Sequence, residues 1–145
     1  MFMKKRGFTL IELLVVIAII GLLSTLSVVA LGTARERARD AVRLSDLRTI
    51  SIALELYYNE NSAYPTAATA VTLGAGNYAC LNVSGWDATG CTTPYLESVP
   101  VDPGSNDYSY TSADGSTYTV DAALEGISGD LDGTIQLSPS GILDV

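Results

Sequence analysis

Two hydrophobic patterns follow one another without a break in the N-terminal part of the chain. Residues 8–31 are mostly apolar and carry a single charge, Glu12. A run of about 20 apolar residues is long enough to cross a bilayer as a helix. In residues 33–61, which contain no glycine or proline, apolar side chains recur at intervals of three and four, as on one face of an amphipathic helix. That face consists of Leu44, Leu47, Ile50, Leu54 and Tyr57. We predict one continuous helix from Phe8 to about Ser62.

Charged residues of both signs accompany the amphipathic pattern. Glu36 and Arg39 are three residues apart, as are Arg43 and Asp46, and Arg39 is followed directly by Asp40. Side chains three or four positions apart on a helix are close enough to form ion pairs. We expect these pairs to line the solvent-exposed side of the helix.

The sequence changes character after the helix. Tyr64-Pro65 ends the helical pattern, because the residue before a proline disfavours the helical conformation. Residues 66–94 are rich in Thr, Ala, Gly and Asn and have only weak periodicity. We expect a long loop here, which could include a short helix or strand, and we expect Trp86 to cover the core of the C-terminal domain.

Alternation of apolar and polar residues predicts a small sheet further along the chain. Residues 108–111 and 117–124 alternate on either side of Asp114-Gly115, which is a typical hairpin signal. Residues 134–137 form a third predicted strand. One face of such an antiparallel sheet can pack on the helix. The predicted fold class is α+β, with a long N-terminal helix packed by a small antiparallel sheet.

Glu12 is the unusual residue of the apolar segment. A charged side chain within a membrane-spanning helix costs about 2.5–3.5 kcal/mol, so it requires a partner or a position close to water. Cleavage after Gly7 would make Phe8 the N-terminal residue, and its amine would lie near the Glu12 carboxylate. The partner amine could belong to the same chain or to a neighbouring copy in an assembly.

The N-terminal residues resemble the class III signal of type IV prepilins and of the pseudopilins of type II secretion. The resemblance rests on a basic stretch at residues 4–6, the sequence Gly7-Phe8-Thr9-Leu10-Ile11-Glu12 and the apolar run that follows. It implies cleavage between Gly7 and Phe8 by a prepilin peptidase, methylation of the Phe8 amine, and polymerisation through the apolar helices. An ordinary secretory signal peptide and a plain transmembrane anchor are the alternatives.

The resemblance divides the chain into four segments. They are a leader (1–7), a membrane and filament-core helix (8–31), the amphipathic half of the same helix (32–63) and a globular head (64–145). By the positive-inside rule, the basic leader stays cytoplasmic and the head is periplasmic or extracellular. Before assembly, the protein would therefore be a single-pass protein of the bacterial inner membrane.

The head is strongly acidic. Residues 49–145 contain no Lys or Arg, whereas twelve of the 16 acidic residues lie there. Such a surface repels phosphate backbones, so nucleic acid is not an expected partner.

The only two cysteines lie in the predicted loop. In an exported domain, Cys80 and Cys91 are expected to form a disulfide, which would stabilise the fold by about 3 kcal/mol. A pair of free thiols is the alternative. A metal site is less favoured, because the sequence has no histidine and no other cysteine to complete it.

The sequence offers no catalytic set, so we do not expect an enzyme. Histidine is absent, and neither a nucleophile motif nor a phosphate-binding loop is present. The resemblance to major pseudopilins implies one candidate cofactor, a calcium ion in the loop after the hairpin. The residues to test are Glu125, Asp130 and Asp132, because calcium binds carboxylate and carbonyl oxygens. A solvated acidic turn is the alternative interpretation.

These features predict a structural subunit of a type IV pilus-like filament, on the cell surface or in the periplasm. The alternative is a major pseudopilin of a type II secretion system, and a minor tip pilin that binds a surface is a third possibility. The implied partners are other copies of the chain, prepilin peptidase, an inner-membrane assembly platform with its ATPase, and minor pilins or pseudopilins.

Overall fold

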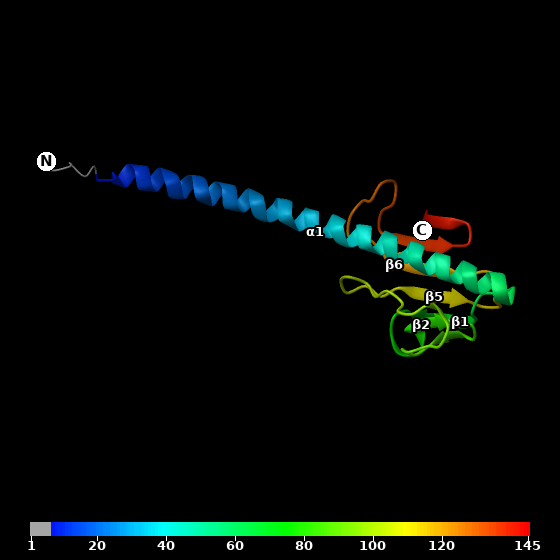
Figure 1. Ribbon diagram of the computed structural model, residues 1–145. Coiled ribbons are helices and arrows are strands. Elements are labelled where there is room, and N and C mark those ends of the chain that lie inside the picture. The colour runs from blue at the N-terminus through cyan, green and yellow to red at the C-terminus, as the bar shows by residue number, and fades with distance from the viewer. Residues whose placement is uncertain (1–6) are drawn as a thin grey trace. The chain divides into compact units, whose positions relative to one another are not determined.

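The computed structural model describes residues 7–145 and contains one long helix, α1, from Leu10 to Asn61 (Figure 1). The predicted helix is confirmed, and its ends lie within two residues of the expected ones. Contacts along the chain divide the described residues into two units, one up to Arg35 and one from Glu36 to Val145. We describe each unit by itself.

The first unit consists of the apolar part of α1. All residues from Gly7 to Arg35 are exposed, including Leu13, Ile17 and Leu22. By length and composition, α1 contains a segment that could cross a membrane, with a mean hydropathy of 2.8. Exposed apolar side chains along several turns require an apolar environment or neighbouring apolar helices.

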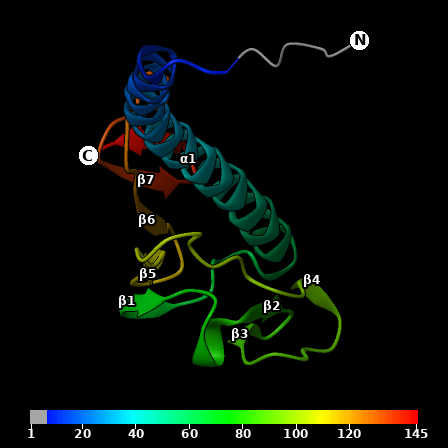
Figure 2. The ribbon, with the colours of Figure 1, turned by 90° about the vertical axis from the view of Figure 1, so that its left-hand side faces the viewer.

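The second unit is built on a five-stranded antiparallel sheet in the order β1-β5-β6-β7-β8. Its strands are β1 (Ala67–Thr72), β5 (Ser109–Ser112), β6 (Thr119–Ala123), β7 (Thr134–Ser138) and β8 (Gly141–Asp144). The predicted hairpin is confirmed, because β5 pairs with β6 and Tyr110 lies opposite Val120. Figure 2 shows β7, β6, β5 and β1 in succession beside the C-terminal half of α1.

A second sheet of three short strands occupies the segment that was expected to be a loop. The strands are β2 (Cys80–Asn82), β3 (Gly85–Asp87) and β4 (Pro94–Leu96), in the order β3-β2-β4. A single 3₁₀ turn, η1 (Gly76–Tyr78), precedes them. The prediction of a long loop over 66–94 was therefore wrong. Strands of three residues are too short to show the alternation by which a strand is recognised.

The core of the second unit lies between α1 and the larger sheet. Leu47, Ile50 and Leu54 on the predicted apolar face of α1 are completely buried, and Leu44 and Tyr57 pack at the margin. The sheet contributes Tyr110, Val120, Ala122, Ile135 and Leu137, and Tyr118 joins them from just before β6. Trp86 is partly buried against this core, and its ring meets that of Tyr110 edge-on at 5.1 Å.

The end of α1 is fixed to the hairpin turn. Ser62 adopts a left-handed backbone conformation with φ of 56°, and its N–H donates to the Tyr58 carbonyl at 2.7 Å. This arrangement closes the helix. Two residues later, the Tyr64 N–H donates to the Gly115 carbonyl at 2.8 Å. The hairpin turn at Asp114-Gly115 is thus held against the segment that leaves the helix.

Candidate functional site

The start of α1 carries the residues expected to act in processing and assembly. Gly7 and Phe8 precede the helix and are exposed. The Glu12 carboxylate accepts hydrogen bonds from the Thr9 backbone N–H at 2.8 Å and from the Thr9 hydroxyl at 2.6 Å. The Glu12 N–H donates in turn to the Thr9 hydroxyl oxygen at 3.3 Å. This reciprocal pattern is a capping box, with Thr9 as the N-cap residue.

Phe8 and Glu12 also line the same shallow hollow at the start of the helix, together with Val15. An amine created at Phe8 would therefore form close to the Glu12 carboxylate. The basic residues 4–6 lie outside the described residues. Cleavage at Gly7 and the charge pairing of Glu12 stay predictions.

The second unit contains a buried ion cluster centred on Arg43 of α1. The guanidinium donates through Nε and Nη2 to the two oxygens of Asp102, at 2.5 and 3.0 Å. Nη1 donates to Asp40 at 2.7 Å, and Nη2 also donates to Glu125 at 2.7 Å. The Arg43 side chain is completely buried. One arginine therefore contacts carboxylates from α1, from the segment between β4 and β5, and from the segment after β6.

Asp40 and Arg39 extend the cluster. The Asp40 carboxylate accepts the backbone N–H groups of Glu125 at 3.0 Å and of Gly126 at 2.9 Å. Arg39 contacts both carboxylate oxygens of Glu125. The loop after β6 is thus hydrogen-bonded to α1 at its start through the backbone N–H groups of Glu125 and Gly126 and through the Glu125 side chain.

The cluster shifts the pKa values of Glu125, Asp102 and Arg43 toward the charged forms. Hydrogen bonds from Arg39 and then Arg43 lower the pKa of Glu125 from 4.5 to about 2. Burial alone would raise the pKa of Asp102, but hydrogen bonds from Arg43 and from the backbone of Gly104 outweigh it, so this pKa lies below its usual value. The Asp102 hydrogen bonds raise the pKa of Arg43. All of these groups are therefore ionised at neutral pH.

The three acidic residues predicted to bind calcium are not brought together. Asp130 and Asp132 are exposed, whereas the Glu125 carboxylate faces Arg39 and Arg43. Among residues 7–145, no three Asp, Glu, Cys or His side chains are arranged so that they could hold a metal ion. As placed, these residues do not fit a calcium ion, which needs several oxygen ligands around it. Calcium binding stays a prediction that rests on the resemblance.

The predicted disulfide is present. Cys80 in β2 is bonded to Cys91, with their Cα atoms 6.4 Å apart. The bond connects β2 with the segment between β3 and β4. It therefore cross-links the smaller sheet.

Sequence reasoning missed the partners of the charged residues on α1. Arg43 was expected to pair with Asp46 on an exposed face, but it is buried and pairs with Asp40. Asp46 accepts the Tyr108 hydroxyl at 2.8 Å instead. One signal was available, because positions 40 and 43 continue the spacing of the buried positions 47, 50 and 54. This stripe places both charges on the face that packs against the head.

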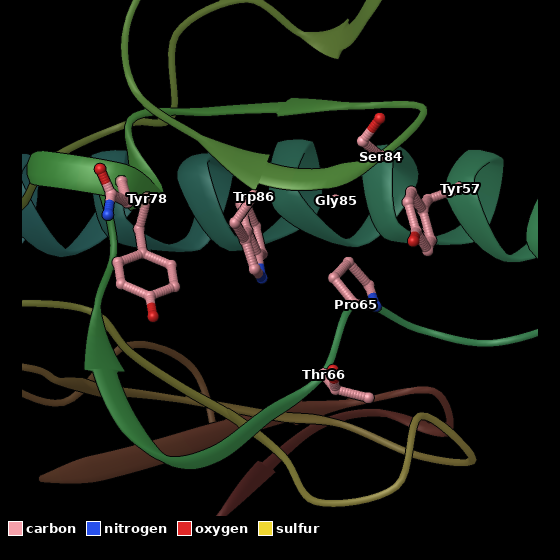
Figure 3. Close-up of a pocket in the computed structure, with 8 residues that line it drawn as sticks. Tyr57, Pro65, Thr66, Tyr78, Ser84, Gly85 and Trp86 are labelled. Atoms are coloured by element: carbon pink, nitrogen blue, oxygen red, sulfur yellow. The ribbon is translucent and has the colours of Figure 1, made fainter.

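An open pocket of about 340 Å³ is lined by the end of α1, the segment just before β1, η1 and the β2–β3 hairpin. Figure 3 shows Trp86 between Tyr78 and Pro65, with Tyr57 and Ser84 at one side. The lining offers hydroxyl groups and aromatic rings but no carboxylate, amine or thiol.

Comparison with known protein families gives two matches that together cover most of the chain. Residues 2–32 match the prokaryotic N-terminal methylation motif. Residues 30–136 match the type II secretion system protein G family. The second match includes the C-terminal half of α1 and strands β1 to β6, and it ends within β7.

Known relatives agree with the second match. The chain is 35% identical to the type II secretion system core protein G of Pseudomonas aeruginosa, over 74% of this chain and 73% of the relative. It is 38% identical to the Escherichia coli core protein G over 72% of this chain and 70% of the relative, and 31% identical to that of Vibrio cholerae over 87% and 83%. No solved structure gives a significant match. Since the protein G model spans more than half of the chain and these relatives align with most of it, the chain belongs to the type II secretion system protein G family.

Proposed function

We propose that the protein is the filament-forming pseudopilin of a type II secretion system. The observation that carries the proposal is the protein G match over residues 30–136, which covers most of the head. The head is the part in which pili and pseudopili would differ, whereas the N-terminal motif suits both. The comparisons therefore favour the second of the two predicted functions over a subunit of a surface pilus.

Assembly would proceed from a membrane-anchored precursor. A prepilin peptidase removes residues 1–7 and methylates the new amine of Phe8. In the membrane, the apolar part of α1 is surrounded by lipid. In the filament, other copies replace the lipid around this fully exposed apolar surface. Helices that pack in this way need a second interaction to fix their register, and the exposed Glu12 carboxylate supplies it by binding the Phe8 amine of a neighbouring copy.

The location and partners of the protein follow from this route. The head folds on the periplasmic side of the inner membrane, where its disulfide is stable. An assembly platform with its ATPase adds copies at the membrane, and minor pseudopilins complete the filament. The work of the protein in this proposal is mechanical, because its exposed apolar helix provides a packing surface for other copies of the chain.

Deletion of the gene in the organism that encodes it distinguishes the two filament types. A pseudopilin mutant retains the exported proteins in the periplasm and keeps its surface pili. Measurement of secreted proteins in the medium, with electron microscopy of the cell surface, provides both readouts. Loss of surface pili with unchanged secretion would show that the protein is a pilus subunit. Restoration by the intact gene controls for effects on neighbouring genes.

A further inference from the structure

A single buried arginine connects three segments of the second unit, Glu36 to Val145, that are far apart in the sequence. Arg43 binds Asp40 within α1, Asp102 at 59 residues' distance and Glu125 at 82 residues' distance. The side chains of Asp40 and Asp102 are 1% and 3% exposed, and that of Glu125 is 26% exposed. The guanidinium therefore has little contact with water and is surrounded by carboxylates.

Three carboxylates in such proximity need a cation among them. A buried carboxylate without a partner is strongly destabilising, and like charges add repulsion. A guanidinium is suited to the task, because it is planar, permanently charged and rich in N–H donors. Arg43 uses Nε, Nη1 and Nη2 for these contacts. Arg39 adds a second positive charge on Glu125 from the exposed side.

The surrounding backbone is shaped around the guanidinium. A Cβ atom at Gly104 would lie 2.9 Å from Arg43 Nη2, 3.1 Å from Asp102 Oδ2 and 3.3 Å from Glu125 Oε1. A side chain at this position would push into the cluster. The Gly104 N–H also donates to Asp102 at 2.7 Å, which holds that carboxylate toward Arg43.

We propose that Arg43, assisted by Arg39, is a built-in structural cation of the second unit, which fastens the loop after β6 to α1 without a metal ion. Asp40 completes the attachment, because it binds the arginine and the backbone N–H groups of Glu125 and Gly126. A divalent cation in the loop would have to take the Glu125 carboxylate from both arginines. The proposal concerns the folding of the head and holds whether the filament is a pseudopilus or a pilus.

Thermal unfolding of the full-length protein in detergent tests the proposal, with the near-ultraviolet circular dichroism of the head as the signal. Trp86 and the core tyrosines report on the head alone, because residues 7–35 contain neither residue type. We expect the same unfolding midpoint in millimolar EDTA and in millimolar calcium chloride. A midpoint lowered by EDTA or raised by calcium would overturn the proposal.

Substitution of the arginines tests directly whether they stabilise the fold. Arg43→Gln leaves three carboxylates without their cation, and we expect the midpoint to fall by about 10 °C or more. Arg39→Gln removes contacts with Glu125 only, so its effect is expected to be smaller. The matched control is Arg37→Gln, because Arg37 is exposed on the same helix and forms no ion pair within residues 7–145. An Arg43→Gln midpoint equal to that of this control would contradict the proposal.

Glu125→Gln keeps the test decisive if the Arg43 variant fails to fold. The amide retains the size of the side chain but loses the charge that both arginines bind. We expect a lower midpoint that again does not respond to EDTA or calcium. If Glu125 bound calcium instead, EDTA would lower the midpoint of the unmodified protein to that of the variant, and the variant would be insensitive to the chelator. That pattern would assign Glu125 to a metal and exclude the proposed role of the arginines.

Discussion

At the scale of the single residue, Glu12 combines two roles that substitutions can separate. Its carboxylate caps the start of α1 through Thr9, and the same group is expected to bind an amine of a neighbouring copy. The cap involves only the chain's own residues and forms in the monomer. The ion pair forms only after cleavage and assembly.

Two substitutions distinguish these uses. Thr9→Ala removes the cap, which stabilises a helix end by about 1 kcal/mol, and leaves the carboxylate in place. Glu12→Ala removes the charge and the carboxylate half of the cap, whereas the backbone N–H of residue 12 can still donate to the Thr9 hydroxyl. We expect both variants to insert into the membrane in normal amounts, and only Glu12→Ala to reduce filament yield strongly. Filaments sheared from cells and quantified by immunoblot, relative to the membrane-bound precursor, give the readout. Equal loss in both variants would mean that the cap, and not the charge, matters for assembly.

Acid should weaken the head through the same carboxylates that surround Arg43. The pKa of Glu125 is about 2 in the folded chain, against an ordinary value of 4.5, because Arg39 and Arg43 bind the ionised form. The unfolded chain therefore takes up the proton first as the pH falls. The stabilisation is complete above pH 4.5 and is lost as the pH falls toward 2. Unfolding midpoints measured across this range should decline, and Glu125→Gln should show a shallower decline. Identical pH profiles would contradict this account.

The contact between the hairpin turn and the end of α1 is a feature at the scale of the elements. Gly115 has φ of +77°, and a Cβ atom there would lie 2.9 Å from the Tyr64 carbonyl oxygen. A side chain at this position therefore introduces both an unfavourable conformation and a backbone clash. The glycine allows the turn to lie directly on the segment after the helix.

Gly115→Ala should lower the free energy of unfolding by about 1–3 kcal/mol. Gly129→Ala is the matched control, because Gly129 also has a left-handed conformation, with φ of +69°, and nothing lies within 4 Å of its added Cβ. The difference between the two variants isolates the contact with Tyr64. Chemical denaturation of the full-length protein in detergent measures both. Equal losses would show that the contact contributes nothing beyond the backbone conformation.

Prediction of the elements from the sequence succeeded where periodicity extends over enough residues. α1 and strands β5, β6 and β7 follow the expected hydrophobic patterns. Strands β2, β3 and β4 were missed because three residues do not make a pattern, and β1, with its alanines and threonines, was missed because its apolar side chains are small. Strand β8 follows a turn next to β7 and was not predicted.

The candidate sites also differ in whether they could be identified from the sequence. The N-terminal motif and the disulfide could be identified from the sequence because the residues that define them are close together or are the only ones of their type. The ion cluster could not, because its carboxylates come from distant segments that only the folded chain brings together. The buried positions of Asp40 and Arg43 were visible in the spacing, but charged residues are rarely assigned to a core.

At the scale of the whole molecule, the chain combines two units with opposite surfaces. The described residues up to Arg35 expose an apolar helix, whereas the unit from Glu36 to Val145 has its own core and an acidic exterior. A chain of this kind is stable only where lipid or its own copies cover the first unit. The protein G family membership and the proposed filament agree with this requirement.

The positions of the arginines also determine where trypsin can separate the two units of the chain. Trypsin cleaves after Lys and Arg, and no such residue follows Arg48. Arg35 and Arg37 are exposed where the two units meet in the sequence, whereas Arg43 is shielded by its carboxylates. Arg48 is also exposed, but it lies on a helical turn that packs into the core through Leu47 and Ile50. Brief digestion in detergent should release a resistant fragment that begins at Glu36 or Ala38, identified by its intact mass. This fragment would lack the apolar helix of the first unit and would be suited to crystallisation without detergent.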